Sequence, residues 1–169
     1  MAARTGRVAA MAVMVAVLPP AGCGDTGGGG GDEERAAAAT AAARAYQRAS
    51  VDQDWEAACE GRTERLRRSW GANTLAQCVE ITGAPRLGAY SDARVSTGEA
   101  VEIPAFGPHP AGIGLRVTLE TGTGKPGTLH TALRLVPGER GTWLVDQAVA
   151  LVDAGRTDTE AVRSALARK

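Results

Sequence analysis

The spacing of apolar residues divides the chain into a helical half and a strand half. Between residues 33 and 83, apolar residues recur three or four positions apart, which is the spacing of one face of a helix. From residue 88 onward, apolar and polar residues alternate, a pattern typical of antiparallel strands with one face covered. Helices followed by a run of strands predict an α+β domain.

Residues 33–49 are rich in alanine and predict the first helix. Alanine on the buried side of a helix allows close approach to a sheet. The side that we expect to face the sheet consists of four alanines with one aromatic residue beside them: Ala38, Ala42, Ala45, Ala49 and Tyr46.

Residues 52–80 predict two or three short helices. Asp54 has the position of an N-cap and Gly61 that of a stop, while Thr74 and Gln77 have the spacing of a capping box. The residues predicted to point inward from these helices are Trp55, Ala58, Cys59, Leu75, Cys78 and Val79.

A basic cluster lies within the same stretch and consists of Arg62, Arg65, Arg67 and Arg68. An anion site or a membrane-binding surface is one interpretation. We favour a solvated helix face on which these arginines pair with Glu60 and Glu64.

The strand half predicts a meander formed by residues 114–121, 128–136 and 142–151, preceded by weaker strands at 89–96 and 99–103. The residues predicted to face the core are mostly aliphatic: Leu115, Val117, Leu119, Leu129, Thr131, Leu133, Leu135, Val145, Gln147 and Val149. The ionisable residues of these strands fall on the opposite face, which we expect to be solvated: Arg116, Glu120, His130, Arg134 and Asp146.

Two further segments frame the meander. Residues 122–127 match the glycine spacing of a dinucleotide-binding loop, but a strand follows them where that site needs a helix, so we interpret them as a hairpin connection. Residues 153–169 predict a short terminal helix that begins near Thr157 and docks weakly or frays. Its apolar residues are Val162, Ala165 and Leu166.

The N-terminus has the features of an export signal. Arg4 and Arg7 precede a short apolar run at residues 8–18, far below the roughly 20 residues that span a bilayer. Residues 21–23 resemble a bacterial lipobox, which implies a signal peptide at 1–22 and a lipid on Cys23; the alternative is an ordinary cleaved signal. Residues 23–32 are then a glycine-rich tether before the folded domain.

The chain contains three cysteines. If Cys23 carries lipid, Cys59 and Cys78 remain to form a disulfide; two free thiols or a metal site are the alternatives. His109 and His130 are distant in sequence and no third ligand recurs at metal spacing, so we expect no metal and no cofactor. The formal net charge is zero, which gives no general attraction to nucleic acid.

The order of elements resembles the NTF2-like (cystatin-like, SnoaL-type) family over residues 33–151. The resemblance depends on a first helix that ends near Tyr46, on Asp54 and Trp55 at the start of the second helix, and on the last strand at 141–146. It is greatest with small secreted bacterial lipoproteins of this fold. It implies a helix lying across a curved antiparallel sheet, with a pocket between them. The candidate residues lining this pocket are Tyr46, Trp55, Thr131, Leu133 and Val145. Position 117 is not assigned to the pocket.

Two functions from different classes are compatible with this resemblance. The one that we favour is a non-enzymatic binding or interaction module, anchored outside the bacterial cell membrane and partnered by a small apolar ligand or an envelope protein. The alternative is a small-molecule isomerase or cyclase, with Tyr46, His130 and Asp146 as candidate groups. We expect Tyr46 to be a packing residue, His130 and Asp146 to be solvated, and His109 to lie in an exposed loop, so we predict no catalysis.

Overall fold

The computed structural model describes residues 30–83, 92–122, 127–151 and 158–168. The predicted signal peptide and Cys23 lie outside these ranges. Five α-helices occur in the described part of the chain: α1 (Gly30–Val51), α2 (Trp55–Glu60), α3 (Glu64–Ser69), α4 (Leu75–Thr82) and α5 (Thr159–Leu166). The strands are β1 (Arg94–Thr97), β2 (Val101–Ile103), β3 (Gly112–Thr121), β4 (Gly127–Pro137) and β5 (Trp143–Ala150).

The strands form one open antiparallel sheet of five strands. The strands β3, β4 and β5 follow one another as the predicted meander, and β1 and β2 pair with successive parts of the free edge of β3. A short 3-10 turn, η1 (Glu139–Gly141), connects β4 to β5. The predicted α+β class is therefore confirmed, although the first two strands are shorter than expected.

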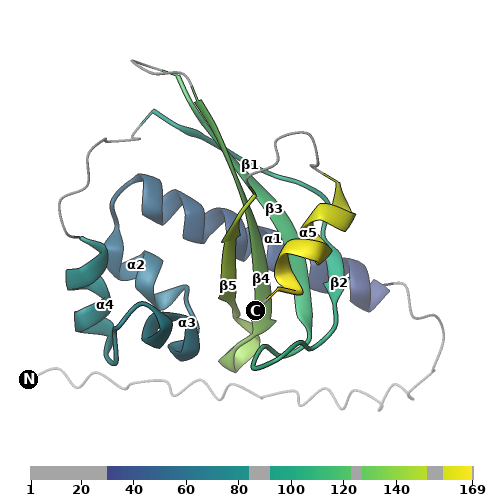
Figure 1. Ribbon diagram of the computed structural model, residues 1–169, viewed down its shortest axis with the longest axis horizontal. Coiled ribbons are helices and arrows are strands. Elements are labelled where there is room, and N and C mark those ends of the chain that lie inside the picture. Colours follow the sequence, from purple (N-terminus) through teal and green to yellow (C-terminus); the bar gives the residue numbers. More distant parts are fainter. Residues whose placement is uncertain (1–29, 84–91, 123–126, 152–157, 169) are drawn as a thin grey trace, which may run out of the picture.

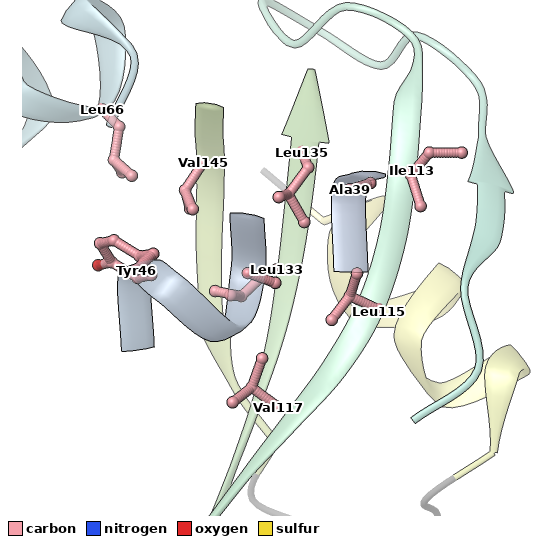
Figure 2. Packing of buried hydrophobic residues seen from close by; sticks show 10 residues of the cluster. Ala39, Tyr46, Leu66, Ile113, Leu115, Val117, Leu133, Leu135 and Val145 are labelled. Atoms are coloured by element: carbon pink, nitrogen blue, oxygen red, sulfur yellow. The ribbon is translucent and has the colours of Figure 1, made fainter. Parts of the chain in front are cut away.

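A helix covers each face of the sheet (Figure 1). We call the two sides the α1 face and the α5 face. On the α1 face, Tyr46, Leu66 and two alanines of α1 pack against aliphatic residues of the three meander strands (Figure 2). The sheet residues of this core are Ile113, Leu115, Val117, Leu133, Leu135 and Val145.

The buried alanines of α1 differ from the predicted ones. Ala39 and Ala43 are fully buried, whereas Ala38 and Ala45 are exposed. Alanines occur on every side of this helix, so they carry little information about its orientation. Tyr46 sets the orientation, because Ala43 and Ala39 lie three and seven positions before it. The helix also begins at Gly30, so residues 30–32 belong to α1 and not to the predicted tether.

The α5 face carries a second core, which corrects two expectations. Val162, Ala165 and Leu166 of α5 are buried against β2 and the meander, so the terminal helix docks firmly. Its N-cap is Asp158, whose carboxylate accepts a hydrogen bond from the Ala161 N–H; Thr157 lies outside the described residues. The part of this face around Arg134, which we expected to be solvated, is therefore covered, whereas Glu120 is exposed as expected.

Gly114 allows this close contact on the α5 face. A Cβ atom at Gly114 would lie 2.5 Å from Ile103 Cγ1 and 3.1 Å from Leu166 Cδ1. Any larger residue at this position of β3 would push β2 and α5 away from the sheet.

A β-bulge changes the phase of β5. Arg134 pairs with Gln147 and Leu135 pairs with Val145, so Asp146 is the extra residue between them. Val145 remains in the core of the α1 face, whereas Val149 packs in the core of the α5 face. The predicted inward positions of Gln147 and Val149 are thus wrong. The prediction that Leu129 faces the core is also wrong, since this residue is 53% exposed near the start of β4.

Candidate functional site

The helices α2 to α4 form a lobe beside β5, and a disulfide closes it (Figure 1). The Asp54 carboxylate caps α2, and Thr74 and Gln77 form a capping box at the start of α4, as the sequence predicts. Cys59 of α2 and Cys78 of α4 are joined with an S–S distance of 2.03 Å. Both cysteines are buried, with Ala72 packed against them. The predicted pairing is confirmed.

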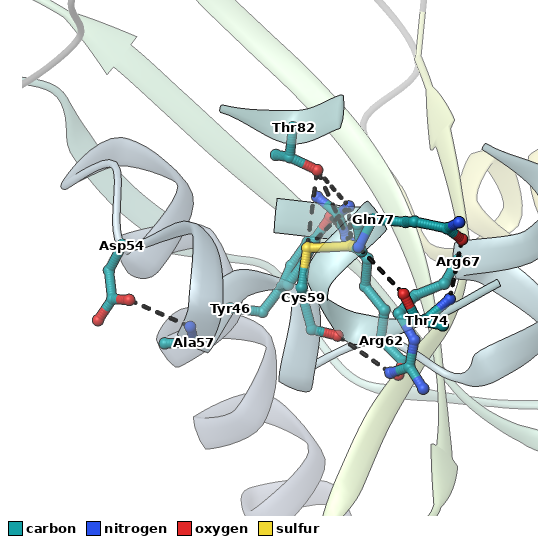
Figure 3. Close-up of a disulfide and its surroundings, with 10 residues drawn as sticks. Tyr46, Asp54, Ala57, Cys59, Arg62, Arg67, Thr74, Gln77 and Thr82 are labelled. Atoms are coloured by element: carbon teal, nitrogen blue, oxygen red, sulfur yellow. Dashed lines mark hydrogen bonds between the residues drawn. A yellow bond between two sulfur atoms is a disulfide. The ribbon is translucent and has the colours of Figure 1, made fainter. Parts of the chain in front are cut away.

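Arg62 lies at the centre of this lobe and is only 2% exposed. Its Nη1 atom donates a hydrogen bond to Thr82 Oγ1 at 3.1 Å, and its Nε atom donates one to the Tyr46 hydroxyl at 3.3 Å (Figure 3). The centre of its guanidinium lies 4.1 Å from the centroid of the Trp70 ring, a cation–π contact. We call this group with the two cysteines the arginine–disulfide centre.

The arginine–disulfide centre corrects the expectation of a solvated basic face. The segment is not one helix, because Gly61 and Thr63 bond to the backbone of Val145 between α2 and α3. Arg62 thus lies in the short connection between α2 and α3, where it forms an isolated bridge with Val145 of β5, and its side chain is buried. Of the predicted pairings, that of Arg68 with Glu64 is present and exposed.

The other two arginines of the basic cluster also have structural partners. Arg67 Nη1 donates to the backbone oxygens of Arg62 and Cys59, at 2.8 and 3.2 Å. Arg65 forms an ion pair with Asp146 and donates to the carbonyl of Pro108. Arg67 thus connects α3 to α2, and Arg65 connects α3 to β5 and to the loop that contains Pro108.

A second polar group surrounds Asp146, which is 1% exposed. Its carboxylate accepts a hydrogen bond from Thr63 Oγ1 at 3.0 Å, pairs with Arg65, and lies 2.7 Å from His109 Nδ1. The prediction that Asp146 is solvated is wrong. The loop around His109 is exposed as predicted, but the His109 side chain itself is half-buried against Asp146. The bulge directs Asp146 toward α3, and the loop of residues 104–110 folds back through a backbone-bonded turn between Phe106 and His109.

Arg134 is fully buried on the α5 face and donates four hydrogen bonds. Its partners are the carbonyls of Pro104, Pro110 and Leu166 at 2.8, 2.9 and 3.0 Å, and Gln147 Oε1 at 3.2 Å. Burial lowers the pKa of Arg134, the nearby Asp146 carboxylate opposes this effect, and Arg65 adds to it. Arg134 therefore joins the proline-rich loop, the sheet and the C-terminal end of α5.

The structure brings together only part of the predicted pocket lining. Tyr46, Leu133 and Val145 are buried in the core of the α1 face and do not line a pocket open to solvent. Trp55 lies in the lobe with its ring against Gly83, and Thr131 is half-buried further along β4. His130 is partly buried, with its Nδ1 atom 3.0 Å from Thr118 Oγ1.

The contact between His109 and Asp146 was the feature that sequence reasoning missed most completely. A carboxylate offers only acceptors, so Nδ1 of His109 donates the hydrogen bond to Asp146, and Nε2 is the ring nitrogen that this carboxylate leaves free. This is the arrangement that orients a histidine for proton transfer. The only local signal in the sequence was the pair of prolines around His109, which restrict the loop.

Other kinds of site receive no support from the described residues. Within the ranges that the structure covers, no three His, Cys, Asp or Glu side chains are grouped closely enough to hold a metal ion. No helix among them combines the length and apolar character needed to cross a membrane. In comparisons with models of protein families, with curated proteins and with solved structures, the chain matches none.

Proposed function

We propose that this chain is an exported lipoprotein whose NTF2-like domain is a non-enzymatic binding or interaction module, held outside the cell membrane by a lipid on Cys23. The observation that carries the proposal is how the buried charges are used. Arg62, Arg134 and Asp146 all bind the protein's own loops, helix ends and side chains, and the core under α1 is aliphatic apart from Tyr46 and the partly buried Trp143. Such groups fix the fold instead of facing a substrate.

Two further features support the location and the family in this proposal. The Cys59–Cys78 disulfide is typical of proteins that mature in an oxidising compartment. The packing of α1 across one face of an antiparallel sheet is what the NTF2-like resemblance implies. The partner that fits these features is a small apolar ligand or another envelope protein.

The location is tested by labelling cells with a lipid precursor. Wild-type protein should carry the label and sediment with membranes, whereas Cys23→Ala should do neither. Cys59→Ala is the matched control, because it removes a cysteine of the domain and leaves Cys23 in place. Equal labelling of wild type and Cys23→Ala would contradict the anchor.

A second candidate function, an isomerase or cyclase, is favoured by the contact of 2.7 Å between His109 and Asp146. Such an enzyme removes a proton next to a carbonyl, so it should exchange that hydrogen with solvent even without net turnover. A panel of cyclic ketones in deuterated water, followed by mass spectrometry, tests this directly. Our proposal predicts no protein-dependent exchange. Exchange that wild type catalyses and His109→Ala does not would replace it with the enzymatic function.

A further inference from the structure

The arginine–disulfide centre holds a buried cation without a carboxylate partner among the described residues. The contacts of Arg62 are a phenol, a hydroxyl, two aromatic rings and the two sulfur atoms. By contrast, Arg65 and Arg68 on the adjacent helix each pair with a carboxylate. Burying a guanidinium is costly, and neutral partners compensate for it less well than an anion does.

The atoms that could become this anion are already in position. Arg62 Nη1 lies 3.5 Å from Cys78 Sγ and 3.9 Å from Cys59 Sγ. The Thr82 hydroxyl lies 3.7 Å from Cys59 Sγ and 3.9 Å from Cys78 Sγ. Sulfur in a disulfide is a weak acceptor, whereas a thiolate accepts strong, charge-assisted hydrogen bonds.

We propose that Cys59 and Cys78 are a redox-active pair whose reaction partner is a dithiol reductant, and that Arg62 stabilises the Cys78 thiolate formed on reduction. The oxidised centre lacks an anion that the reduced centre gains. Stabilising the reduced form makes a disulfide easier to reduce, because the equilibrium compares the two states directly. The inference concerns the disulfide alone and does not depend on the lipid anchor or on the family.

The reaction balances as an ordinary thiol–disulfide exchange. A thiolate of the reductant attacks Cys59 Sγ, the S–S bond breaks, and its electron pair leaves on Cys78 Sγ beside Arg62. The second thiolate of the reductant then attacks its own sulfur in the mixed disulfide and releases Cys59. The reductant loses two electrons and two protons; Cys59 takes one proton and the other passes to solvent.

The alternative is an inert structural cross-link, and burial alone does not distinguish the two. Both cysteines are buried, so α4 must move before a reductant reaches them, and exchange should be slow. The informative quantity is therefore the equilibrium between oxidised and reduced protein, and not its rate.

The experiment uses the full chain with Cys23→Ser, which removes the third thiol. The protein is equilibrated with mixtures of reduced and oxidised dithiothreitol, quenched in acid, alkylated and weighed by mass spectrometry. Arg62→Gln should shift the equilibrium toward the disulfide by about tenfold, or about 30 mV for a two-electron couple. Arg68→Gln is the charge-matched control, since Arg68 is exposed and paired with Glu64, and it should leave the equilibrium unchanged within about twofold.

A second measurement needs no arginine variant, in case Arg62→Gln does not fold. Thiolate absorbance of the reduced Cys23→Ser protein is followed against pH. A free thiol has a pKa of about 8.5, and an adjacent arginine lowers this pKa. A first titration at least about one unit below that value supports the proposal. Ordinary titration of both thiols, or equal redox equilibria for Arg62→Gln and Arg68→Gln, would overturn it.

Discussion

The two faces of the sheet are built in different ways. On the α1 face, alanines of the helix lie against Leu115, Leu133 and Leu135, and Tyr46 supplies the aromatic residue of this core. On the α5 face, the apolar core is smaller, and it borders a network of hydrogen bonds from Arg134 to Gln147 and to three backbone carbonyls.

The difference follows from what each face must cover. A long regular helix satisfies its own backbone groups along most of its length, so apolar contact is sufficient on the α1 face. The α5 face meets a proline-rich loop and the C-terminal end of a short helix, both of which present free carbonyls. Buried carbonyls need donors, and Arg134 provides them. Charge is thus buried where irregular chain meets the sheet.

The largest effect that we predict is on the α1 face. Leu133→Ala should lower the free energy of unfolding by about 3 kcal/mol, since Leu133 is fully buried and its removal leaves a cavity. Urea denaturation followed by circular dichroism measures this loss.

Leu129→Ala, on the same strand, is the matched control. Leu129 is 53% exposed, so its replacement should change stability by less than about 0.5 kcal/mol. Similar losses for both variants would show that the α1 face is not the main apolar core.

A smaller loss is predicted on the α5 face. Arg134→Met should lower the free energy of unfolding by about 2 kcal/mol, because the three carbonyls and the Gln147 amide oxygen lose their donor. Its lowered pKa means that the folded state binds the proton less tightly than the unfolded chain does. The charge itself therefore lowers stability at all pH values below the folded pKa, neutral pH included. Methionine carries no charge, so the variant does not lose this share of the stability.

Arg94→Met on β1 is the control for Arg134→Met, because Arg94 is exposed and should be replaced with little effect. If Arg134→Met were as stable as wild type, the hydrogen bonds would not outweigh the burial of charge. The network on the α5 face would then need a reason other than stability.

Local signals in the sequence predicted the parts of this fold that local chemistry decides. Asp54 and the Thr74–Gln77 pair cap their helices because capping needs only residues a few positions apart. The disulfide could be predicted because Cys59 and Cys78 lie on the apolar sides of adjacent short helices. Alternation alone gave the strands β3 to β5.

The candidate sites could not be predicted in this way, because they depend on contacts between distant segments. The bulge at Asp146 cannot be seen in the alternation, yet it moves Val149 to the other face. Arg62 is buried at an isolated bridge to Val145, and nothing around it in sequence signals that bridge. Tyr46 was predicted to be a packing residue, but its hydroxyl also accepts a hydrogen bond from Arg62.

The smallest predicted effect tests how the α5 face is closed. Asp158→Ala removes the carboxylate that accepts a hydrogen bond from the Ala161 N–H, at 2.9 Å, and should destabilise α5 by about 1 kcal/mol. Because Leu166 of the same helix gives its carbonyl to Arg134, fraying of α5 should also expose the network beneath it. Hydrogen exchange should thus become faster in both α5 and the loop of residues 104–110, while amides of α1 keep their protection. Asp54→Ala, which removes the N-cap of α2, is the matched control, and its effect should stay within the disulfide lobe. Faster exchange in α5 alone would show that α5 and the loop open independently, and that Arg134 does not couple them.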